Sequence, residues 1–273
     1  MNGARLDVLV PSSLVREAED GREATRKLGY VARAATVFRA DRLVVFPDRE
    51  GETSRGEEFV HTVLAYAATP PYLRRDVWDR RDELEHVGVL PPLLPHDSGP
   101  EGSETRDGIV TEVGPEGRVR VNCGLQHPIS LRVPPDRALA EGERVTVRVS
   151  SREPVRAKLV DDRRGLDVCR RELSEELAAA DVAVATSRHG DDLSVPVLET
   201  VTRRCRDADR VAVAFGAPER GLPTILGYPE DAPVDPADTR FDRWLNTVPN
   251  QGSEVVRTEE AMFASLGALS LSP

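Results

Sequence analysis

The chain has 273 residues, a net charge of −10 and a hydrophobic content of 39%, which is enough for a sizeable core and for two domains. No stretch approaches the roughly 18 apolar residues of a membrane-spanning helix, and the first residues lack a signal-peptide core, so we expect neither a membrane protein nor a secreted one. The three cysteines and five histidines are scattered without metal or redox spacing, which predicts a cytoplasmic protein without a metal site.

The basic residues are of an unusual kind. Arginine supplies 35 of the 37, because lysine occurs only at Lys27 and Lys158, and 47 acidic residues stand against them. An acidic surface poor in lysine and aromatic residues is typical of cytoplasmic proteins of salt-loving archaea, and a low-pI protein from a GC-rich bacterium is the alternative. In molar salt the Debye length falls to about 3 Å, so the net charge does not exclude a nucleic-acid partner.

The first 90 residues alternate between strand and helix patterns. Apolar runs at 6–10 and 43–46 predict buried strands. Residues 57–68 predict a helix that ends before Pro70, since proline disfavours helix at the preceding residue. A helix is also predicted over 22–39, with an apolar stripe of Leu28, Val31, Ala35 and Phe38. This βαβα order favours a parallel sheet.

The pattern changes after residue 90. Residues 91–107 are rich in proline and polar residues, which predicts a linker. From 108 to 158 apolar residues alternate with polar ones, a pattern typical of the short strands of a small β-barrel. The turn-forming residues between these strands lie at 114–117, 134–136 and 141–143.

The α/β pattern then returns. We predict strands over 182–185 and 211–215 and a helix over 197–206. The barrel is therefore expected as an insertion within one α/β domain. The predicted parts are residues 1–95 and 159–273 for the α/β domain and residues 104–158 for the barrel.

The predicted barrel differs from the rest of the chain in charge. Residues 104–158 contain ten basic and eight acidic residues, a net charge of +2 against −12 elsewhere. A small five-stranded barrel with this charge is a candidate RNA platform. It contains no Phe, Tyr or Trp for base stacking, so a spacer or a dimer-packing module is the alternative.

Two loops in the last quarter of the chain form a candidate ligand site. The apolar run 211–215 stops at the Gly/Pro loop 216–221, and the turn-rich segment 246–252 leads to a helix that begins near Thr258. Loops at the carboxyl ends of parallel strands are where open α/β sheets bind ligands. Glu259 and Glu260 suit the first turn of this helix, whose apolar face is expected to serve core or dimer packing. That face consists of Met262, Leu266 and Leu269.

The order of several short motifs resembles the SPOUT superfamily of knotted methyltransferases. The similar branch is found in archaea and eukaryotes, carries an inserted OB-fold and contains RNA uridine-N3 methyltransferases. The motifs span nearly the whole chain and lie at residues 11–14, 29–35, 68–74, 88–93, 185–188, 215–221 and 246–261. The resemblance implies an α/β fold with a deep trefoil knot, the cofactor S-adenosylmethionine, and a homodimer with its active site across the interface.

The resemblance also assigns the cofactor to the loops at 186–188, 215–221 and 246–252. By the residues alone, Gly216 and Gly221 would only end a strand and form a turn. The residues carried over as cofactor-binding are Thr186, Phe215, Gly216, Glu219, Gly221, Asn246, Thr247, Val248, Gln251 and Gly252.

For the RNA side, Arg33 is the candidate catalytic residue. The motif 29–33 is similar to one that ends in a functional arginine in ribose-methylating relatives, although a solvated surface arginine is the alternative. A guanidinium can orient a phosphate or stabilise an oxyanion. Because uridine N3 is weakly acidic, a nearby cation that stabilises the imidate would suffice without a dedicated base. Further candidates for RNA contact are Arg26, Arg74, Arg188 and Arg220.

The expected function is S-adenosylmethionine-dependent methylation of RNA, with ribosomal RNA as substrate and uridine N3 as the preferred target atom. The target atom rests on the family resemblance alone. Methylation of the ribose 2′-oxygen is the enzymatic alternative, suggested by the motif at 29–33. A non-catalytic RNA-binding or ribosome-assembly factor that keeps the fold is the alternative from another class.

Overall fold

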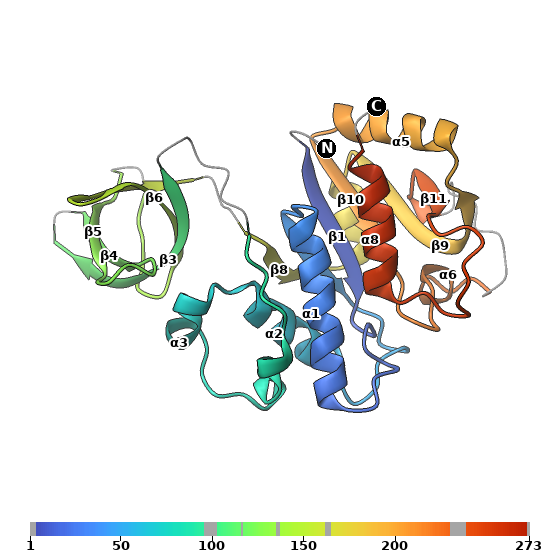
Figure 1. Ribbon diagram of the computed structural model, residues 1–273, viewed down its shortest axis with the longest axis horizontal. Helices are drawn as coiled ribbons and strands as arrows, with labels where there is room; N and C mark the ends of the chain where they lie inside the picture. Colours follow the sequence, from blue (N-terminus) through green and yellow to red (C-terminus); the bar gives the residue numbers. More distant parts are fainter. Residues whose placement is uncertain are drawn as a thin grey trace. The chain divides into compact units, whose positions relative to one another are not determined.

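The computed structural model describes residues 4–95, 103–115, 117–134, 137–161, 165–229 and 239–271. The chain divides into two compact units, and many of their elements are labelled in Figure 1. The first, called here the α/β unit, comprises residues 1–68, 82–93 and 166–273. The second, the barrel unit, comprises residues 69–81 and 94–165.

The α/β unit is built on a six-stranded parallel sheet with the strand order β11-β9-β10-β1-β2-β8. The first strand of the chain lies inside this sheet, where Val8 is paired with Val213 on one side and Leu43 on the other. The strands are β1 (Arg5–Pro11), β2 (Arg42–Phe46), β8 (Asp167–Arg170), β9 (Val182–Asp192), β10 (Arg210–Ala214) and β11 (Arg243–Asn246).

Helices cover both faces of the sheet, because side chains on a strand alternate between its two faces. Val8 packs into the core under the first group of helices and Leu9 into the core under the second. The first group is α1 (Gly21–Val37), α2 (Glu57–Ala68), α5 (Val195–Asp207) and α8 (Thr258–Leu269), and the second is α4 (Leu173–Ala179) and α6 (Leu222–Ile225). Two short 3-10 helices, η2 (Asp82–Leu84) and η3 (Val87–Val89), complete the unit.

A buried ion cluster lies between strands β1, β2 and β10. Asp7 is fully buried and accepts hydrogen bonds from Arg42 Nε at 2.9 Å and Arg210 Nε at 2.5 Å. Both arginines also pair with Glu176 of α4. Burial alone would raise the pKa of Asp7, but the hydrogen bonds from Arg42 and Arg210 outweigh it and hold this pKa below its ordinary value.

The barrel unit is an antiparallel five-stranded sheet with the order β5-β4-β3-β6-β7. Its edge strands β5 and β7 contact each other, so the sheet is nearly closed around a core that includes Val110, Val121 and Val147. The strands are β3 (Glu104–Gly114), β4 (Arg118–Asn122), β5 (Ile129–Arg132), β6 (Arg144–Arg152) and β7 (Val155–Val160). The 3-10 helix η1 (Pro71–Leu73) and the short helix α3 (Arg74–Val77) belong to the same unit.

The parallel sheet and the small antiparallel barrel-like sheet confirm the predicted mixed α/β class. The elements that were not predicted are all short, namely β8, β11, α3, α4, α6 and the three 3-10 helices. The predicted linker extends too far, because residues 104–107 already belong to β3. Part of that linker (96–102), Glu116 of the first predicted turn and Pro135 and Asp136 of the second lie outside the described residues.

Residues 69–81 belong to the barrel unit, whereas the predicted boundaries place them in the first part of the α/β domain. The predicted domain boundaries, at residues 1–95, 104–158 and 159–273, stay a prediction. Within the described ranges, no helix has the length and apolar character needed to cross a membrane.

Candidate functional site

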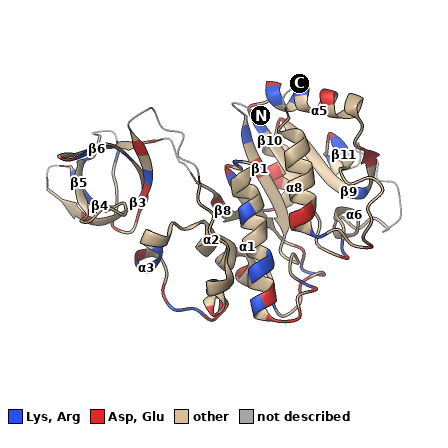
Figure 2. Cartoon of the chain, viewed as in Figure 1, with Lys and Arg blue, Asp and Glu red and all other residues tan. Residues whose placement is uncertain are grey.

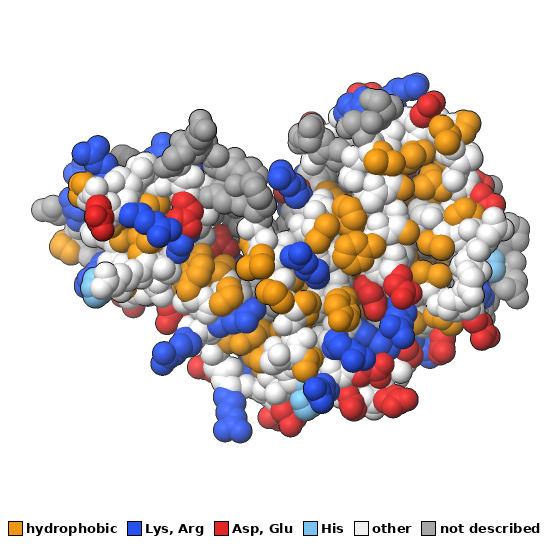
Figure 3. Space-filling model, in the orientation of Figure 1, with side chains coloured by type: hydrophobic (Ala, Val, Ile, Leu, Met, Phe, Trp, Pro, Cys, Tyr) orange, Lys and Arg blue, Asp and Glu red, His pale blue; other side chains and the backbone are white. Residues whose placement is uncertain are grey.

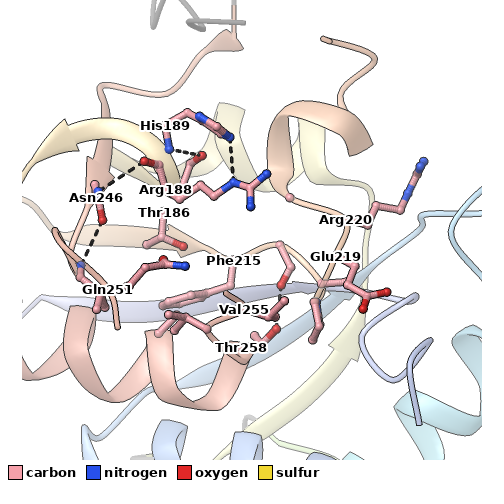
Figure 4. A pocket seen from close by; sticks show the side chains of 18 of the residues that line it. Thr186, Arg188, His189, Phe215, Glu219, Arg220, Asn246, Gln251, Val255 and Thr258 are labelled. Carbon is pink, nitrogen blue, oxygen red and sulfur yellow. Dashed lines mark hydrogen bonds between the residues drawn. The ribbon is translucent and has the colours of Figure 1, made fainter. Parts of the chain in front are cut away.

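A pocket lies at the carboxyl ends of β10 and β11, and it is enclosed by the loops that follow these strands and by residues 186–189 of β9 (Figure 4). Residues 186–188 were predicted as a loop, but they belong to β9, whose pairing with β11 shifts from Ala185 to Asp191. The carboxyl ends of parallel strands meet at one edge of a sheet, which is why these loops converge. Gly252 is the one predicted cofactor residue that does not line the pocket. The nine others do, namely Thr186, Phe215, Gly216, Glu219, Gly221, Asn246, Thr247, Val248 and Gln251.

The loop after β10 is folded tightly. Ala217 and Arg220 exchange backbone hydrogen bonds of 3.0 and 3.1 Å across a turn in which Glu219 has a φ of 60°. A Cβ atom on Gly216 would lie 2.9 Å from the backbone of both Gly221 and Leu222, closer than real Cβ atoms approach. Only glycine therefore fits at position 216 without displacing this wall of the pocket.

Asn246 joins the loop after β11 to strand β9. Its side-chain amide donates to the carbonyl of Arg188 at 3.3 Å and to Asp192 Oδ1 at 3.1 Å, and its Oδ1 accepts from the backbone N–H of Val248 at 3.1 Å. The side chain thus fixes the turn that follows β11 against the neighbouring strand.

Helix α8 holds the loops at 216–221 and 246–252 in place. Thr258, its first residue, donates through its hydroxyl to the carbonyl of Gly216 at 2.8 Å. The hydroxyls of Thr247 and of the fully buried Ser265 are hydrogen-bonded at 2.7 Å. Burial raises the pKa of the neighbouring Glu259 above its ordinary value. Helix α8 therefore connects the loops at 216–221 and 246–252, through Thr258 and Ser265.

His189 is a pocket residue that the sequence did not single out. Arg188 Nε donates to His189 Nε2 at 2.9 Å, and both residues line the pocket. The five histidines are scattered along the chain, so composition gave no reason to choose this one. The available signal was its position directly after the predicted loop 186–188.

Arg220 lines the pocket but its guanidinium is already engaged. It makes three contacts of 2.9–3.1 Å with the carboxylate of Asp48, which is 5% exposed. The hydrogen bond with Asp48 raises the pKa of Arg220 further above its ordinary value. The suggested contact of Arg220 with RNA stays a prediction.

The other three candidate arginines do not line the pocket. Arg33 lies on α1 and donates to the carbonyl of Leu93, and more weakly to that of Pro92 at 3.5 Å. Arg26 is exposed on the same helix. Arg74 belongs to the barrel unit, where its Nε donates to the carbonyl of Thr69 at 3.1 Å.

The chemical character of the pocket suits a nucleoside-like ligand. Val248, Val255 and Val256 offer partly or fully exposed apolar side chains, while the loops present backbone groups and β9 presents the hydroxyl of Ser187. Apolar walls with a few polar groups are the usual composition of cofactor sites. Within the described parts of the chain, no group of three or more His, Cys, Asp or Glu side chains is arranged to hold a metal ion.

Comparisons with known proteins find a matching protein family and several similar proteins. A family model described as "Putative RNA methyltransferase" matches residues 5–269. An uncharacterised protein of Halobacterium salinarum is 62% identical over 280 residues, covering 97% of this chain and 98% of that protein. A second one, from Haloarcula marismortui, is 60% identical over 277 residues with the same coverage. Both relatives come from halophilic archaea, in line with the composition.

More distant relatives carry a named activity. The human 28S rRNA (uridine-N(3))-methyltransferase is 29% identical over 306 residues, covering 97% of this chain and 77% of that protein. Among solved structures, an RNA 2′-O ribose methyltransferase matches with a TM-score of 0.40 and 12% identity, over 98% of this chain and 56% of that chain. A structural similarity at that level supports no conclusion about this chain. The family model, in contrast, matches nearly the full length, and the chain therefore belongs to this family of RNA methyltransferases.

Proposed function

We propose that the protein transfers a methyl group from S-adenosylmethionine to N3 of a uridine in ribosomal RNA. The observation that carries this proposal is the pocket beside β9 and at the ends of β10 and β11, in a chain that is 29% identical to a 28S rRNA (uridine-N(3))-methyltransferase.

The residues of the pocket fit this cofactor. Val248, Val255 and Val256 would pack against the adenine, and the close fold around Gly216 lets the backbone approach the ligand. Thr186 and Gln251 would lie beside the remaining, polar part of the cofactor. When bound, S-adenosylmethionine supplies an electrophilic methyl group. The new bond forms to uridine N3, the bond from the sulfonium breaks to leave a thioether, and the N3 proton passes to solvent.

On the acceptor side, Arg188 is the pocket cation best placed to act. Its Nε is oriented by His189, and a guanidinium beside N3 would stabilise the negative charge left when the proton departs. Such stabilisation lowers the pKa of N3, so no dedicated base is required.

The proposal includes a trefoil knot in the α/β unit and an OB-fold in the barrel unit. For the knot, the support is that the last segment of the chain is hydrogen-bonded to two earlier parts. Asn246 donates to the carbonyl of Arg188 in β9, and Thr258 donates to the carbonyl of Gly216 in the loop after β10. For the OB-fold, it is the five-stranded order β5-β4-β3-β6-β7 with contact between its edge strands.

The barrel unit is the proposed RNA platform. Arg118 and Arg132 are exposed and lie directly opposite each other on β4 and β5, with Arg120 two residues further on the same face. Like charges facing each other destabilise a sheet, and a bound phosphate backbone would relieve that repulsion.

The aromatic residues that the predicted insert lacks come from residues 69–81. Tyr72 is 38% exposed and lies under the guanidinium of Arg106 at 5.5 Å, and Trp78 lies under that of Arg81 at 5.7 Å. Rings paired with arginine are suited to stacking on the bases of single-stranded RNA.

A homodimer completes the proposal. Hydrophobic side chains gather on the surface over α1 and α8 (Figure 3), where Tyr30, Val37 and Phe263 are 45%, 44% and 41% exposed. Arg33 lies on α1 and lines no part of its own pocket. Its catalytic role therefore requires that it reach the pocket of a second protomer.

The activity is tested by incubating the protein with S-adenosylmethionine and ribosomal RNA in molar salt, followed by nucleoside mass spectrometry. We expect 3-methyluridine. A 2′-O-methylated nucleoside would establish the ribose alternative instead. A protein that binds no cofactor at millimolar concentration, measured by calorimetry, would be a non-catalytic factor.

The shared active site is tested by mixing two inactive variants, Arg33→Ala and Gly216→Ala. If Arg33 acts across the interface, mixed dimers contain one intact site and recover activity. No recovery, with dimers shown by light scattering, would remove Arg33 from the partner's active site.

A further inference from the structure

The turn at residues 217–220 adopts a conformation that its sequence does not favour. Pro218 is followed by Glu219 with a φ of 60°, and a positive φ at the third position of such a turn usually requires glycine or asparagine. A non-glycine residue keeps this conformation only when its surroundings impose it. Since Glu219 lines the pocket, what imposes the conformation also shapes the site.

The surroundings that impose it are an ion pair beneath the turn. Arg220 Nε lies 3.1 and 2.9 Å from the two carboxylate oxygens of Asp48, and its Nη2 lies 3.0 Å from Oδ1. Glu50 is a weaker partner at 3.4 Å, with a side chain that is 90% exposed. A side chain at Gly51 would overlap the Asp48 carboxylate and approach Arg220 Nε to 2.7 Å. The buried carboxylate of Asp48 is therefore the anchor.

Asp48 is itself fixed by the segment that follows β1. Ser13 Oγ donates to Asp48 Oδ2 at 2.5 Å, and the backbone N–H of Asp48 donates to Ser12 Oγ at 2.8 Å. Ser12 Oγ in turn donates to Glu52 Oε1 at 2.5 Å. Both serines are buried, with at most 1% exposure. The short motif at residues 11–14 thus supports the anchor from the ends of strands β1 and β2.

We propose that Asp48 is a positioning residue for the cofactor, which acts through Arg220 to hold the turn 217–220 in its binding conformation before the ligand arrives. This inference rests on the proposed function of the pocket. Thr258 restrains the same loop from the other side through the carbonyl of Gly216. A loop fixed at both ends loses less conformational entropy on binding, so the preformed wall raises affinity.

The test compares Asp48→Asn with the matched control Glu50→Gln, which removes the exposed partner of the same arginine. Calorimetry with S-adenosylhomocysteine measures cofactor affinity, and steady-state methylation measures KM for each substrate. For Asp48→Asn we expect Kd and the KM for S-adenosylmethionine to rise at least about tenfold, the loss typical of a charged hydrogen bond. The kcat and the KM for RNA stay near the wild-type values, as do all constants of Glu50→Gln.

Two more variants keep the test decisive if Asp48→Asn does not fold. Arg220→Lys retains the charge but not the two-pronged contact, so its affinity falls in the same direction. In the double variant Asp48→Asn/Arg220→Gln the effects do not add, because both changes break one ion pair.

The inference is overturned if the folded variants bind the cofactor as tightly as the wild type, or if their loss appears in kcat and in the KM for RNA instead. A wild-type protein that binds no cofactor would defeat the proposed function, and the inference with it. Normal binding by the wild type and by all variants would defeat the inference alone.

Discussion

The two units use charge in different ways, as their colouring in Figure 2 illustrates. The barrel unit holds 16 of the 37 basic residues and 14 of the 47 acidic ones, a net charge of +2, so the α/β unit carries −12. In the α/β unit the central pairs are buried, with side-chain exposures of 12% for Arg42 and 0% for Asp7. In the barrel the pair Arg152–Glu104 is 64% and 36% exposed.

This difference separates structural charges from those that are available to a partner. Breaking a buried pair leaves an uncompensated charge, whereas exposed pairs contribute little and exchange readily with solvent. Arginines on the barrel can therefore give up their partners for phosphate groups. Those around Asp7 and Asp48 cannot do so without loss of structure.

The largest expected effect tests the buried cluster. Asp7→Asn should lower the free energy of unfolding by about 3–5 kcal/mol, because Arg42 and Arg210 lose a buried partner. Chemical denaturation measures this, with Glu57→Gln as the control that removes a peripheral partner of Arg170 at 3.8 Å. Equal stability of the two variants would contradict the structural role of the cluster.

The same cluster predicts a pH dependence. The pKa of Asp7 is lower in the folded than in the unfolded chain. Its stabilisation is thus fully present above the unfolded value of about 3.9 and is lost as the pH falls through the folded value. Wild type and Asp7→Asn should therefore differ most near neutral pH and converge in acid. A constant difference across the acid range would show that the Asp7 charge is not responsible.

The next effect concerns the cofactor loop. Gly216→Ala should weaken binding of S-adenosylhomocysteine by about a hundredfold, or about 2.7 kcal/mol, since the new Cβ displaces the backbone at Gly221. Gly88→Ala is the control, because a Cβ there meets nothing within 4 Å. Calorimetry measures the affinity of both variants for S-adenosylhomocysteine. Unchanged affinity of the Gly216 variant would place the ligand elsewhere.

A smaller effect is expected for the RNA platform. The double variant Arg118→Gln/Arg132→Gln should bind RNA about tenfold more weakly and reduce the slope of log affinity against log salt by about 1.4, if each arginine neutralises one phosphate of a single strand. Cofactor affinity should not change. The control, Arg203→Gln/Arg206→Gln, removes two exposed charges from α5 of the α/β unit. A similar loss in both double variants would mean that net charge alone attracts RNA.

The smallest effect is expected for the barrel's surface pairs. Glu104→Gln breaks contacts with Arg106 at 2.8 Å and Arg152 at 2.6 Å. Solvent screening limits the cost to about 1 kcal/mol or less, measured by chemical denaturation. A loss as large as that of Asp7→Asn would remove the distinction between the two units.

The sequence predicted those parts of the molecule that depend on local patterns. The strands at 6–10 and 43–46, the helix over 57–68 and the alternating strands of the barrel all follow from apolar periodicity. Strand β11 did not, because four residues with an exposed arginine at one end carry no clear period. Helix α4 is only seven residues long and has the same difficulty.

The site was predictable in part for the same reason. Nine of the ten predicted cofactor residues line one pocket because strand ends bring their loops to one edge. His189 was missed because the scattered histidines gave no reason to choose it, and Asp48 was missed because its importance comes from a contact between distant parts of the chain. The bond from Arg220 to Asp48 spans 172 positions of sequence, and no local pattern could reveal it.

The position of β1 has a consequence for how the chain is made. Strand β1 pairs on one side with β2, which follows it in the chain, but on the other side with β10, whose residues begin at Arg210. One hydrogen-bonding edge of β1 therefore stays open until about 200 further residues have been synthesised. Pairing over such a separation gives a high contact order and slow folding. During translation this open edge is the part of the nascent chain most exposed to wrong strand partners.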